Sequence, residues 1–277
     1  MLRSIAQIRQ RLERERRHNA RIALVPTMGA LHEGHLALVD AARRRADVVV
    51  MSVFVNPLQF GPNEDLARYP RDLPRDQALA EGRGVDLLFA PEAGEMYRGD
   101  GGTRVIAGDA ATRWEGAIRP GHFDGVLTVV AKLFHIIEPD VAIFGQKDIQ
   151  QVTLIRSMVR DLDCPVELEI VATVREPDGL AMSSRNVYLS ATERGDALVL
   201  SRALDAAQAA TRRGETGAER IRGIIEAAFA AVPAVRPDYI AIVDPDRLAP
   251  VDTVRPGTIV AVAARVGATR LIDNAIL

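Results

Sequence analysis

The chain has 277 residues, 48% hydrophobic and 26% charged, which is enough for one large globular domain or two unequal ones. A formal net charge of -2 gives no general attraction to nucleic acid, and no apolar stretch has the length of a transmembrane helix or the form of a secretory leader. Cys164 is the only cysteine, so an intrachain disulfide is excluded and we expect this side chain to serve packing. These features predict a cytoplasmic protein that acts on small molecules, without nucleic acid or a membrane as partner.

The amino-terminal part has the pattern of an α/β domain. Apolar runs at residues 22–25, 48–55, 85–90, 141–144 and 166–171 alternate with helix-like segments, as in parallel strands joined by crossover helices. The clearest helix lies at residues 126–137, where apolar side chains at helical spacing form one stripe before Pro139 ends the segment. We expect that stripe to face the core.

The pattern changes after residue 185. A capping-box sequence at residues 190–193 begins a long alanine-rich helix, and Gly214 separates it from a second helix. Pro233 and Pro237 bracket the exit from that helix, and strands are expected at residues 239–243, 258–264 and 270–273. This part reads as a small α+β domain, with the boundary near residues 186–190.

Residues 26–35 form the first segment with candidate chemistry. They follow the apolar run at 22–25 and precede a helical pattern, so backbone N–H groups at the start of a helix could meet an anion. His32 and His35 are three positions apart and can point at one ligand, and Gly29 and Gly34 permit close backbone approach. A metal site is disfavoured, because His-Glu-Gly-His is not the usual zinc pattern and no third ligand is identifiable. A pair of structural histidines that cap the turn stays open.

Two further segments offer cations and hydroxyl groups. Lys147 follows the run at 141–144 through Gly145, which puts an ammonium group at the carboxyl end of a parallel strand, where α/β proteins bind ligands. Ser183, Ser184 and Arg185 combine two hydroxyls with a guanidinium group suited to phosphate. A surface lysine and an ordinary serine-containing turn are the structural alternatives.

Uncharged amides follow the second apolar run. Asn56 and Gln59 lie in a loop shaped by Pro57, where they could bond to hydroxyl groups and a carboxylate. Turn structure alone also explains this composition. In the segment 119–122, His122 is expected to have a structural or supporting role.

These segments together carry a resemblance. Residues 32–35 fit the His-x-Gly-His signature of the nucleotidyltransferase superfamily, and Met182-Ser183-Ser184-Arg185 is similar to its second nucleotide-binding signature. With residues 54–60, 119–123, 145–151 and 178–186 in the same order, the chain resembles the pantothenate synthetase (pantoate–β-alanine ligase) family over most of residues 22–190.

The resemblance implies an ATP-dependent ligase that forms an amide bond. Such an enzyme condenses (R)-pantoate with β-alanine to pantothenate, AMP and pyrophosphate through a pantoyl adenylate, in pantothenate and coenzyme A biosynthesis. It implies a Rossmann-like catalytic domain at residues 1–187 that binds ATP and pantoate, and a smaller α+β lid domain at residues 188–277. A homodimer and Mg²⁺ as companion of ATP are also implied, with the metal ligands left open.

The resemblance also assigns roles to residues. His32, His35, Lys147, Ser183, Ser184 and Arg185 would stabilise phosphate charge, and His35 could donate a proton to the leaving group. ATP would be held by these residues together with Met28, Gly29, Ala30, Leu31, Glu33, Gly34, Gly145, Gln146, Asp148, Val174 and Met182. Pantoate would contact Asn56, Gln59 and Gln151. Gln146 stands where the family usually has glutamate, which puts the detail of ATP or metal binding in question.

Three other functions are weighed against this one. Another adenylyl- or cytidylyltransferase of the superfamily would share the phosphate signatures, but it has less reason for Gln59 and Gln151. An aminoacyl-tRNA synthetase is disfavoured by a short, slightly acidic chain without an evident basic RNA-binding domain. A noncatalytic nucleotide-binding protein would bind ATP without releasing pyrophosphate.

Overall fold

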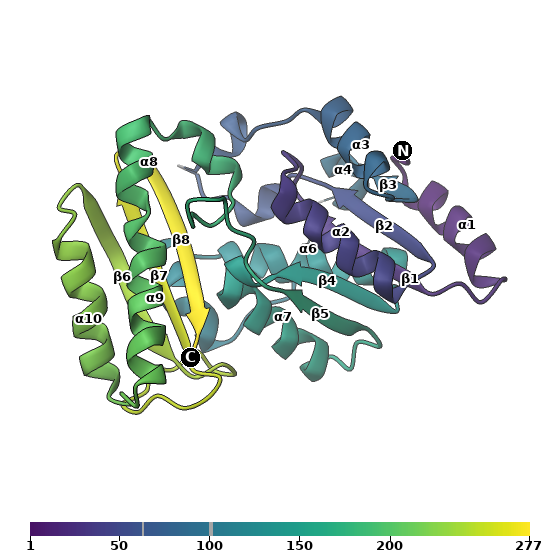
Figure 1. Ribbon diagram of the computed structural model, residues 1–277. Helices are drawn as coiled ribbons and strands as arrows, with labels where there is room; N and C mark the ends of the chain where they lie inside the picture. The colour runs from purple at the N-terminus through teal and green to yellow at the C-terminus, as the bar shows by residue number, and fades with distance from the viewer. Residues whose placement is uncertain (63, 100–101) are drawn as a thin grey trace.

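The computed structural model describes residues 1–62, 64–99 and 102–277 and contains two β-sheets (Figure 1). A parallel sheet has the strand order β3-β2-β1-β4-β5, and an antiparallel sheet has the order β6-β7-β8. The strands are β1 (Ile22–Thr27), β2 (Val48–Val53), β3 (Leu87–Phe89), β4 (Val141–Gly145), β5 (Glu167–Val171), β6 (Val235–Val243), β7 (Ile259–Val266) and β8 (Thr269–Ile276). The predicted fold class is therefore confirmed: a Rossmann-like parallel sheet with a smaller α+β part.

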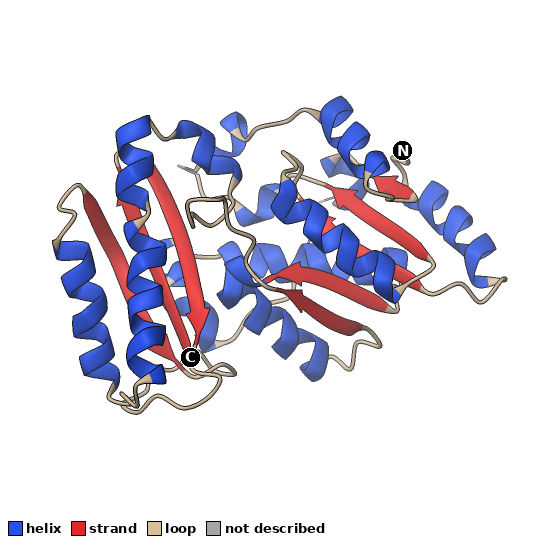
Figure 2. Cartoon of the chain, in the orientation of Figure 1, coloured by secondary structure: helices blue, strands red, loops and turns tan. Residues whose placement is uncertain are grey.

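Helices cover both faces of the parallel sheet and one face of the antiparallel sheet (Figure 2). The α-helices are α1 (Ile5–Arg16), α2 (Glu33–Arg45), α3 (Leu73–Gly82), α4 (Ala93–Met96), α5 (Glu115–Ile118), α6 (His122–Ile137), α7 (Ile149–Asp161), α8 (Ala191–Ala197), α9 (Val199–Arg212) and α10 (Ala218–Ala230). Short 3₁₀ turns are η1 (Pro57–Gln59), η2 (Asp65–Arg68), η3 (Asp109–Thr112), η4 (Gln146–Asp148) and η5 (Ser184–Tyr188). Within the described residues, no helix is both long and apolar enough to cross a bilayer.

The inner strands β1, β2 and β4 are mostly apolar because both of their faces are buried, whereas the edge strand β5 carries Glu167 and Glu169 and is only partly buried. Ile22 and Leu24 of β1 pack into a core shared with α1, α6 and α7, whereas Ala23 and Val25 pack on the other side against α2 and α3. Continuous apolar runs, rather than alternating ones, are what this two-sided burial requires.

Helix α6 is buried on nearly every side, which is more than the single stripe predicted for it. Thr128 and Asp124 on its outer side accept hydrogen bonds from the backbone N–H groups of Val105 and Ala107, so an extended segment covers that side. A Cβ on Gly125 would lie 2.2 Å from the carbonyl oxygen of Leu58, so only glycine lets η1 approach the helix.

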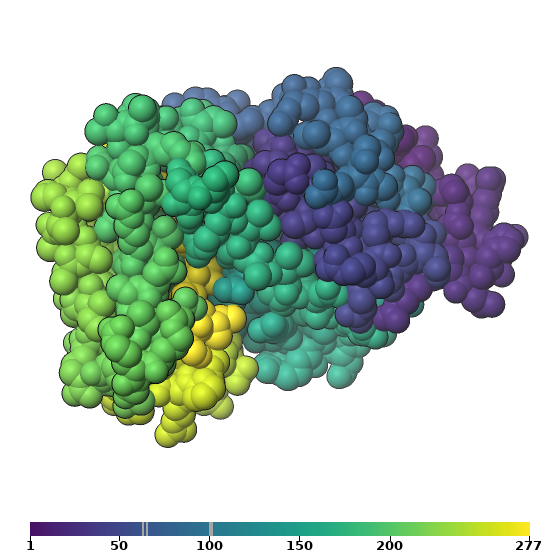
Figure 3. All heavy atoms as spheres, in the orientation of Figure 1, coloured from purple at the N-terminus to yellow at the C-terminus, as the bar shows by residue number. Residues whose placement is uncertain are grey.

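The antiparallel sheet is covered on one face by α9 and α10, where Val262 of β7 packs with Leu204 and Ile225. Its other face contributes Val243 and Ile259 to the core around α6 and α7. Figure 3 shows the carboxyl-terminal part, green to yellow, packed directly against the amino-terminal part. The division at residues 187 and 188 stays a prediction.

Two details of this part differ from the expectation. The long helix expected after residue 190 is two helices, α8 and α9, with a break at Leu198. Strand β6 begins at Val235 and includes Pro237, where the pairing register with β7 shifts before Tyr239. Proline is tolerated because β6 is an edge strand, whose outward N–H groups need no sheet partner.

The strand order creates a crevice at the carboxyl ends of β1 and β4. These strands are neighbours in the sheet, but the chain leaves β1 toward β2 and β3 and returns to β4 on the opposite side. Connections that diverge in this way leave a gap above the strand ends, which is where open α/β sheets bind ligands.

Candidate active site

The turn after β1 is shaped by a residue that sequence reasoning missed. Gly29 and Ala30 have φ angles of 82° and 51°, and the backbone N–H groups of Ala30 and Leu31 donate to the two carboxylate oxygens of Asp76 at 2.9 and 2.8 Å. A Cβ on Gly29 would lie 2.7 Å from Asp76 Oδ2. Asp76 is only 1% exposed and comes from α3, so no local signal in residues 26–35 points to it.

His32 and His35 form a capping box at the start of α2. His32 Nδ1 accepts a hydrogen bond from the backbone N–H of Gly34 at 3.1 Å, and His35 Nδ1 accepts one from the backbone N–H of His32 at 3.3 Å. The two ring centroids lie 4.1 Å apart. The alternative of two structural histidines that cap the turn therefore describes part of their role. Both rings cap the helix, and both also line a cavity.

These hydrogen bonds decide where each imidazole carries its proton. An Nδ1 atom that accepts a hydrogen bond must present a lone pair, so the proton of the neutral ring sits on Nε2. Burial, reinforced by the charge of Lys147, lowers the pKa of His32 to about 4, and burial, reinforced by His32, lowers the pKa of His35 to about 3. Both rings are therefore neutral Nε2–H donors near pH 7.

Several of the turn's backbone N–H groups are bonded within the protein, and their predicted contact with an anion stays a prediction. The N–H of Gly29 donates to Thr27 Oγ1 at 3.2 Å, those of Ala30 and Leu31 donate to Asp76, and those of His32 and Gly34 donate to the histidine rings. The imidazoles satisfy the helix start through one nitrogen and offer the other as a donor. The imidazoles thus add side-chain donors at the helix N-terminus that the sequence predicted.

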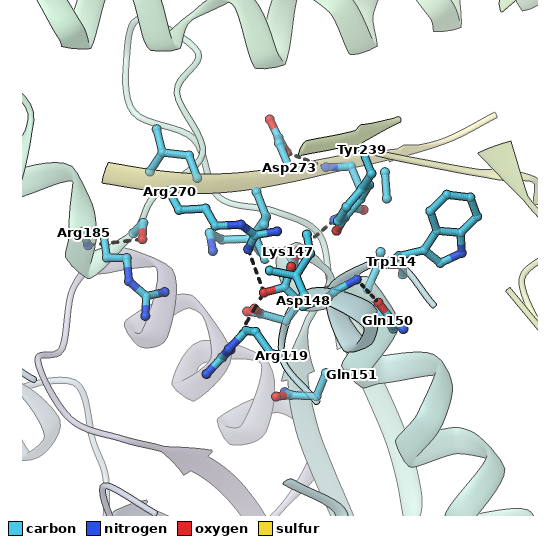
Figure 4. Close-up of a pocket in the computed structure, with 18 of the residues that line it drawn as sticks. Trp114, Arg119, Lys147, Asp148, Gln150, Gln151, Arg185, Tyr239, Arg270 and Asp273 are labelled. Atoms are coloured by element: carbon cyan, nitrogen blue, oxygen red, sulfur yellow. Dashed lines mark hydrogen bonds and ion pairs between the residues drawn. The ribbon is translucent and has the colours of Figure 1, made fainter. Parts of the chain in front are cut away.

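Lys147 and Asp148 lie at the end of the neighbouring strand. Gly145 ends β4, and the 3₁₀ turn η4 then carries both side chains over the crevice before α7 begins at Ile149. Lys147 and Asp148 line the same cavity as the histidines, and Figure 4 shows both residues beneath the β8 ribbon.

The second signature segment folds back on itself beside the crevice. The backbone N–H of Met182 donates to the carbonyl oxygen of Val174 at 3.0 Å, and Ser183 Oγ accepts from the backbone N–H of Arg185 at 3.2 Å. Asn186 Nδ2 donates to Glu176 Oε1 at 2.7 Å and closes the loop. These contacts turn the predicted phosphate-binding residues toward the cavity.

The two loop amides have different roles. Asn56 is 1% exposed, and its Nδ2 donates to Gln59 Oε1 and to the Gly125 carbonyl oxygen while its Oδ1 accepts from Tyr97 and Leu58. Its bonding groups are taken by protein partners and it lines neither cavity, so its predicted contact with pantoate gains no support and stays a prediction. Gln59 does line the cavity, and Asn56 orients it.

Arg119 and His122 bind the backbone of the loop that carries Gln59. His122 Nδ1 donates to the carbonyl oxygen of Gln59 at 2.8 Å, Arg119 Nη2 donates to that oxygen at 3.2 Å, and the guanidinium group pairs with Glu64. Burial, reinforced by Arg119, lowers the pKa of His122 to about 4. A neutral His122 that supports Gln59 agrees with the supporting role expected for it.

Most of the predicted residues line two adjoining cavities of about 250 and 1010 Å³. Lys147, Asp148, Gln151, Ser183 and Arg185 line both. The smaller cavity is also lined by Met28, His32, Gly34, His35, Gln59, Gly145, Val174, Met182 and Ser184.

Six predicted residues line neither cavity: Gly29, Ala30, Leu31, Glu33, Asn56 and Gln146. The first three shape the turn against Asp76. Glu33 pairs with Arg83 at 3.4 Å, and Gln146 Nε2 donates to Asn274 Oδ1 at 3.1 Å. Long-range partners turn these side chains away from the crevice.

Comparison with known proteins gives a consistent result. A family model described as pantoate-beta-alanine ligase matches residues 1–276. The pantothenate synthetase of Roseiflexus castenholzii is 54% identical to this chain, and the match covers 96% of each of the two chains. The pantothenate synthetase of Moorella thermoacetica is 52% identical, and the match covers 100% of this chain and 98% of the other.

Comparison with solved structures points to the same family. The pantothenate synthetase of Thermus thermophilus superimposes with a TM-score of 0.93 at 53% identity, covering 99% of this chain and 98% of that one. The pantoate-beta-alanine ligase of Francisella tularensis, complexed with beta-gamma ATP and beta-alanine, gives a TM-score of 0.80 at 33% identity and covers 100% of this chain and 97% of that one. The fold, the crevice and these full-length similarities establish that the chain belongs to the pantoate–β-alanine ligase family.

Proposed function

We propose that this protein condenses (R)-pantoate with β-alanine, with cleavage of ATP to AMP and pyrophosphate, as a step of pantothenate and coenzyme A biosynthesis. One observation carries the proposal: His32 and His35, which follow β1, line the same cavity as Lys147, which follows β4. Gln59 and Gln151 also line this cavity. Neutral donors and a cation there suit phosphate, and uncharged amides suit the hydroxyl and carboxylate groups of a small hydroxy acid.

The reaction proceeds in two steps. A pantoate carboxylate oxygen attacks the α-phosphorus of ATP, the bond to the bridging oxygen breaks, and pyrophosphate leaves with the electron pair. The amine of β-alanine then attacks the acyl carbon, loses a proton, and AMP leaves as the amide forms. Activation is needed because a free carboxylate has no useful leaving group.

The phosphate-facing residues act by electrostatic stabilisation. The ammonium group of Lys147 and the Nε2–H groups of His32 and His35 would stabilise negative charge as it moves from the α-phosphate to pyrophosphate. The lowered pKa values favour hydrogen-bond donation by neutral rings over proton donation by an imidazolium, which disfavours His35 as a general acid. Ser183, Ser184 and Arg185 would add donors from the other side.

The smaller cavity also has an apolar wall that suits pantoate. Val129, Val130 and Leu133 of α6 line it together with the two amides. The geminal methyl groups of pantoate would pack on that wall, while Gln59 and Gln151 bond to its hydroxyl and carboxylate oxygens.

Magnesium would be bound with ATP rather than by a protein cage. No three His, Cys, Asp or Glu side chains in residues 1–62, 64–99 and 102–277 cluster as a metal site. Asp148 is the carboxylate that lines both cavities among the described residues, and one carboxylate plus phosphate oxygens is a usual Mg²⁺ environment. Bound in this way, the cation would neutralise phosphate charge.

We also propose, on the family resemblance, a homodimer in the cytoplasm with residues 188–277 as the lid domain. The lid assignment rests on the 1010 Å³ cavity, which is lined both by Lys147 and by residues of β6, β7 and β8.

An isotope-exchange assay tests the proposed function. Pantoate alone should support exchange of labelled pyrophosphate into ATP, since activation precedes attack by the amine, and AMP should accumulate only when β-alanine is also present. Exchange that requires β-alanine, or that proceeds equally well without pantoate, would contradict the proposed order. A stable nucleotide conjugate as product would favour another nucleotidyltransferase, and ATP binding without pyrophosphate release would favour a noncatalytic protein.

A further inference from the structure

Strand β8 carries two neighbouring polar residues that are almost completely buried. Asp273 and Asn274 are 3% and 2% exposed. Successive residues of a strand point to opposite sides of the sheet. Asn274 therefore faces the amino-terminal part, and Asp273 lies on the side of α9 with Leu271 and Ala275.

Asn274 binds the backbone of the turn that carries Lys147. Its Nδ2 donates to the carbonyl oxygens of Gln146 and Lys147, both at 2.9 Å, and its Oδ1 accepts from Gln146 Nε2 at 3.1 Å. Both amide hydrogens and the carbonyl oxygen are thus used on one turn. A flipped amide would direct an oxygen at two carbonyl oxygens, so the contacts fix the orientation of Asn274.

Asp273 binds the segment that leads to the second signature. Its carboxylate pairs in a bidentate way with Arg175, at 2.6 and 3.1 Å, and the same guanidinium group donates to the carbonyl oxygen of Gly179 at 3.1 Å. Asp273 Oδ1 also accepts from the backbone N–H of Asn274 at 2.8 Å, which links the two braces. Arg175 lies one residue from Val174 at the base of the loop that presents Ser183.

We propose that Asp273 and Asn274 are positioning residues that set the two halves of the phosphate site, Asn274 through Lys147 and Asp273 through Arg175. The carboxyl-terminal part then has a second role besides covering the site. Neither residue lies in the matched signatures, and this inference rests on the proposed function, because the readout is adenylate formation. Figure 4 shows Asp273 on the β8 ribbon directly above Lys147.

The chain provides a matched control for the general contribution of hydrogen bonds between its amino-terminal and carboxyl-terminal parts. Thr153 of α7 is 2% exposed, and its Oγ1 donates to the carbonyl oxygen of Pro245 at 3.2 Å. This bond joins the same two parts and touches neither phosphate segment. Thr153→Val removes it with little change in shape.

The test compares the two half-reactions in full-length variants. Asn274→Ala should lower the rate of pantoate-dependent pyrophosphate exchange about 10- to 30-fold, and amide formation from preformed pantoyl adenylate should change by less than about threefold. Asn274→Ser, which can donate to one carbonyl only, should give an intermediate loss. Asp273→Asn should chiefly raise the KM for ATP, by about tenfold. Thr153→Val should stay within about twofold of the parent protein in both half-reactions.

A double-variant cycle separates positioning from general loosening. If Asn274 acts through Lys147, adding Asn274→Ala to Lys147→Met should slow exchange by less than about threefold more, because the cation is already absent. Thermal melting shows whether each variant is folded. If Asn274→Ala does not fold, the same cycle is measured with Asn274→Ser. Full additivity, equal loss in both half-reactions, or an equal effect of Thr153→Val would overturn the proposal. A parent protein that shows no exchange would overturn the proposed function, and this inference with it.

Discussion

The two phosphate-facing segments are built in different ways. Residues 28–35 are braced from within the amino-terminal part, locally through Thr27 and the two histidine rings and at longer range through Asp76 on α3. Residues 174–186 depend on the Arg175–Asp273 pair, whose members are 98 positions apart in the chain. The first segment is set once the parallel sheet forms, whereas the second requires the antiparallel sheet to be docked. If the proposed roles hold, catalysis therefore depends on both sheets, although most of the predicted site residues belong to the part with the parallel sheet.

The largest expected effect is that of Lys147→Met, which removes the cation that both segments face. Methionine keeps much of the apolar stem, so we expect a loss on the order of 100-fold or more in adenylate formation with the fold retained. Supplying preformed pantoyl adenylate should partly bypass the defect in a single-turnover reaction with β-alanine. A normal rate of adenylate formation, or equal loss in both half-reactions, would refute this role.

Asp76→Asn should damage the first segment selectively. One of the two charge-assisted acceptors becomes an NH₂ group facing a backbone N–H, which should cost about 2–3 kcal/mol of unfolding free energy. Chemical denaturation measures this loss. Asp72→Asn is the control, since Asp72 caps the same helix at an exposed position and should cost no more than about 1 kcal/mol. Equal losses in the two variants would contradict a special role for Asp76.

Stability should fall on acidification because of the buried histidines. Their native pKa values, about 4 for His32 and about 3 for His35, lie below the ordinary 6.5, so between these values the unfolded chain binds protons that the native chain does not. The stabilisation is complete above about pH 6.5 and is lost as the pH falls through 4 toward 3, by several kcal/mol in total, because each unit of pKa shift is worth about 1.4 kcal/mol. Urea titrations from pH 7 to 4 measure the slope. His35→Gln should flatten it and His18→Gln, at an exposed position, should not.

Arg175→Lys should weaken the second segment while leaving the first intact. Lysine cannot form the bidentate pair with Asp273, so the KM for ATP should rise about tenfold with a smaller change in kcat. Steady-state kinetics measure both constants. A kcat loss with unchanged KM would mean that the pair does not act through ATP binding.

Gln146→Glu should have the smallest effect. The carboxylate cannot donate to Asn274 Oδ1, but Asn274 keeps its two hydrogen bonds to the backbone of the turn. We expect a change of less than about threefold in pyrophosphate exchange. A tenfold change in either direction would show that this side chain contacts ATP or its metal ion after all.

The local sequence pattern was enough to predict the strands of the parallel sheet. It also predicted that His32, His35 and Lys147 lie close together at the ends of these strands. Apolar runs mark buried strands, and the ends of parallel strands meet at one edge, so residues that follow them can be grouped without a structure. Partners such as Asp76 and Asn274 could not be found in this way, because an acidic or amide residue in a helix or an edge strand has no periodic signature. The surroundings of Asn56 could not be found from sequence for the same reason, because its groups are bonded to the tertiary neighbours Tyr97 and Gly125.

The capping role of the two histidines also restricts what could replace them. An asparagine side chain extends about as far as Nδ1 of imidazole, and a glutamine side chain about as far as Nε2. At position 32 or 35, asparagine could still end the helix but would not reach the ligand, and glutamine could reach the ligand but would leave the helix start open. Imidazole spans both positions with a rigid ring, so one residue joins the folding of α2 to the recognition of phosphate.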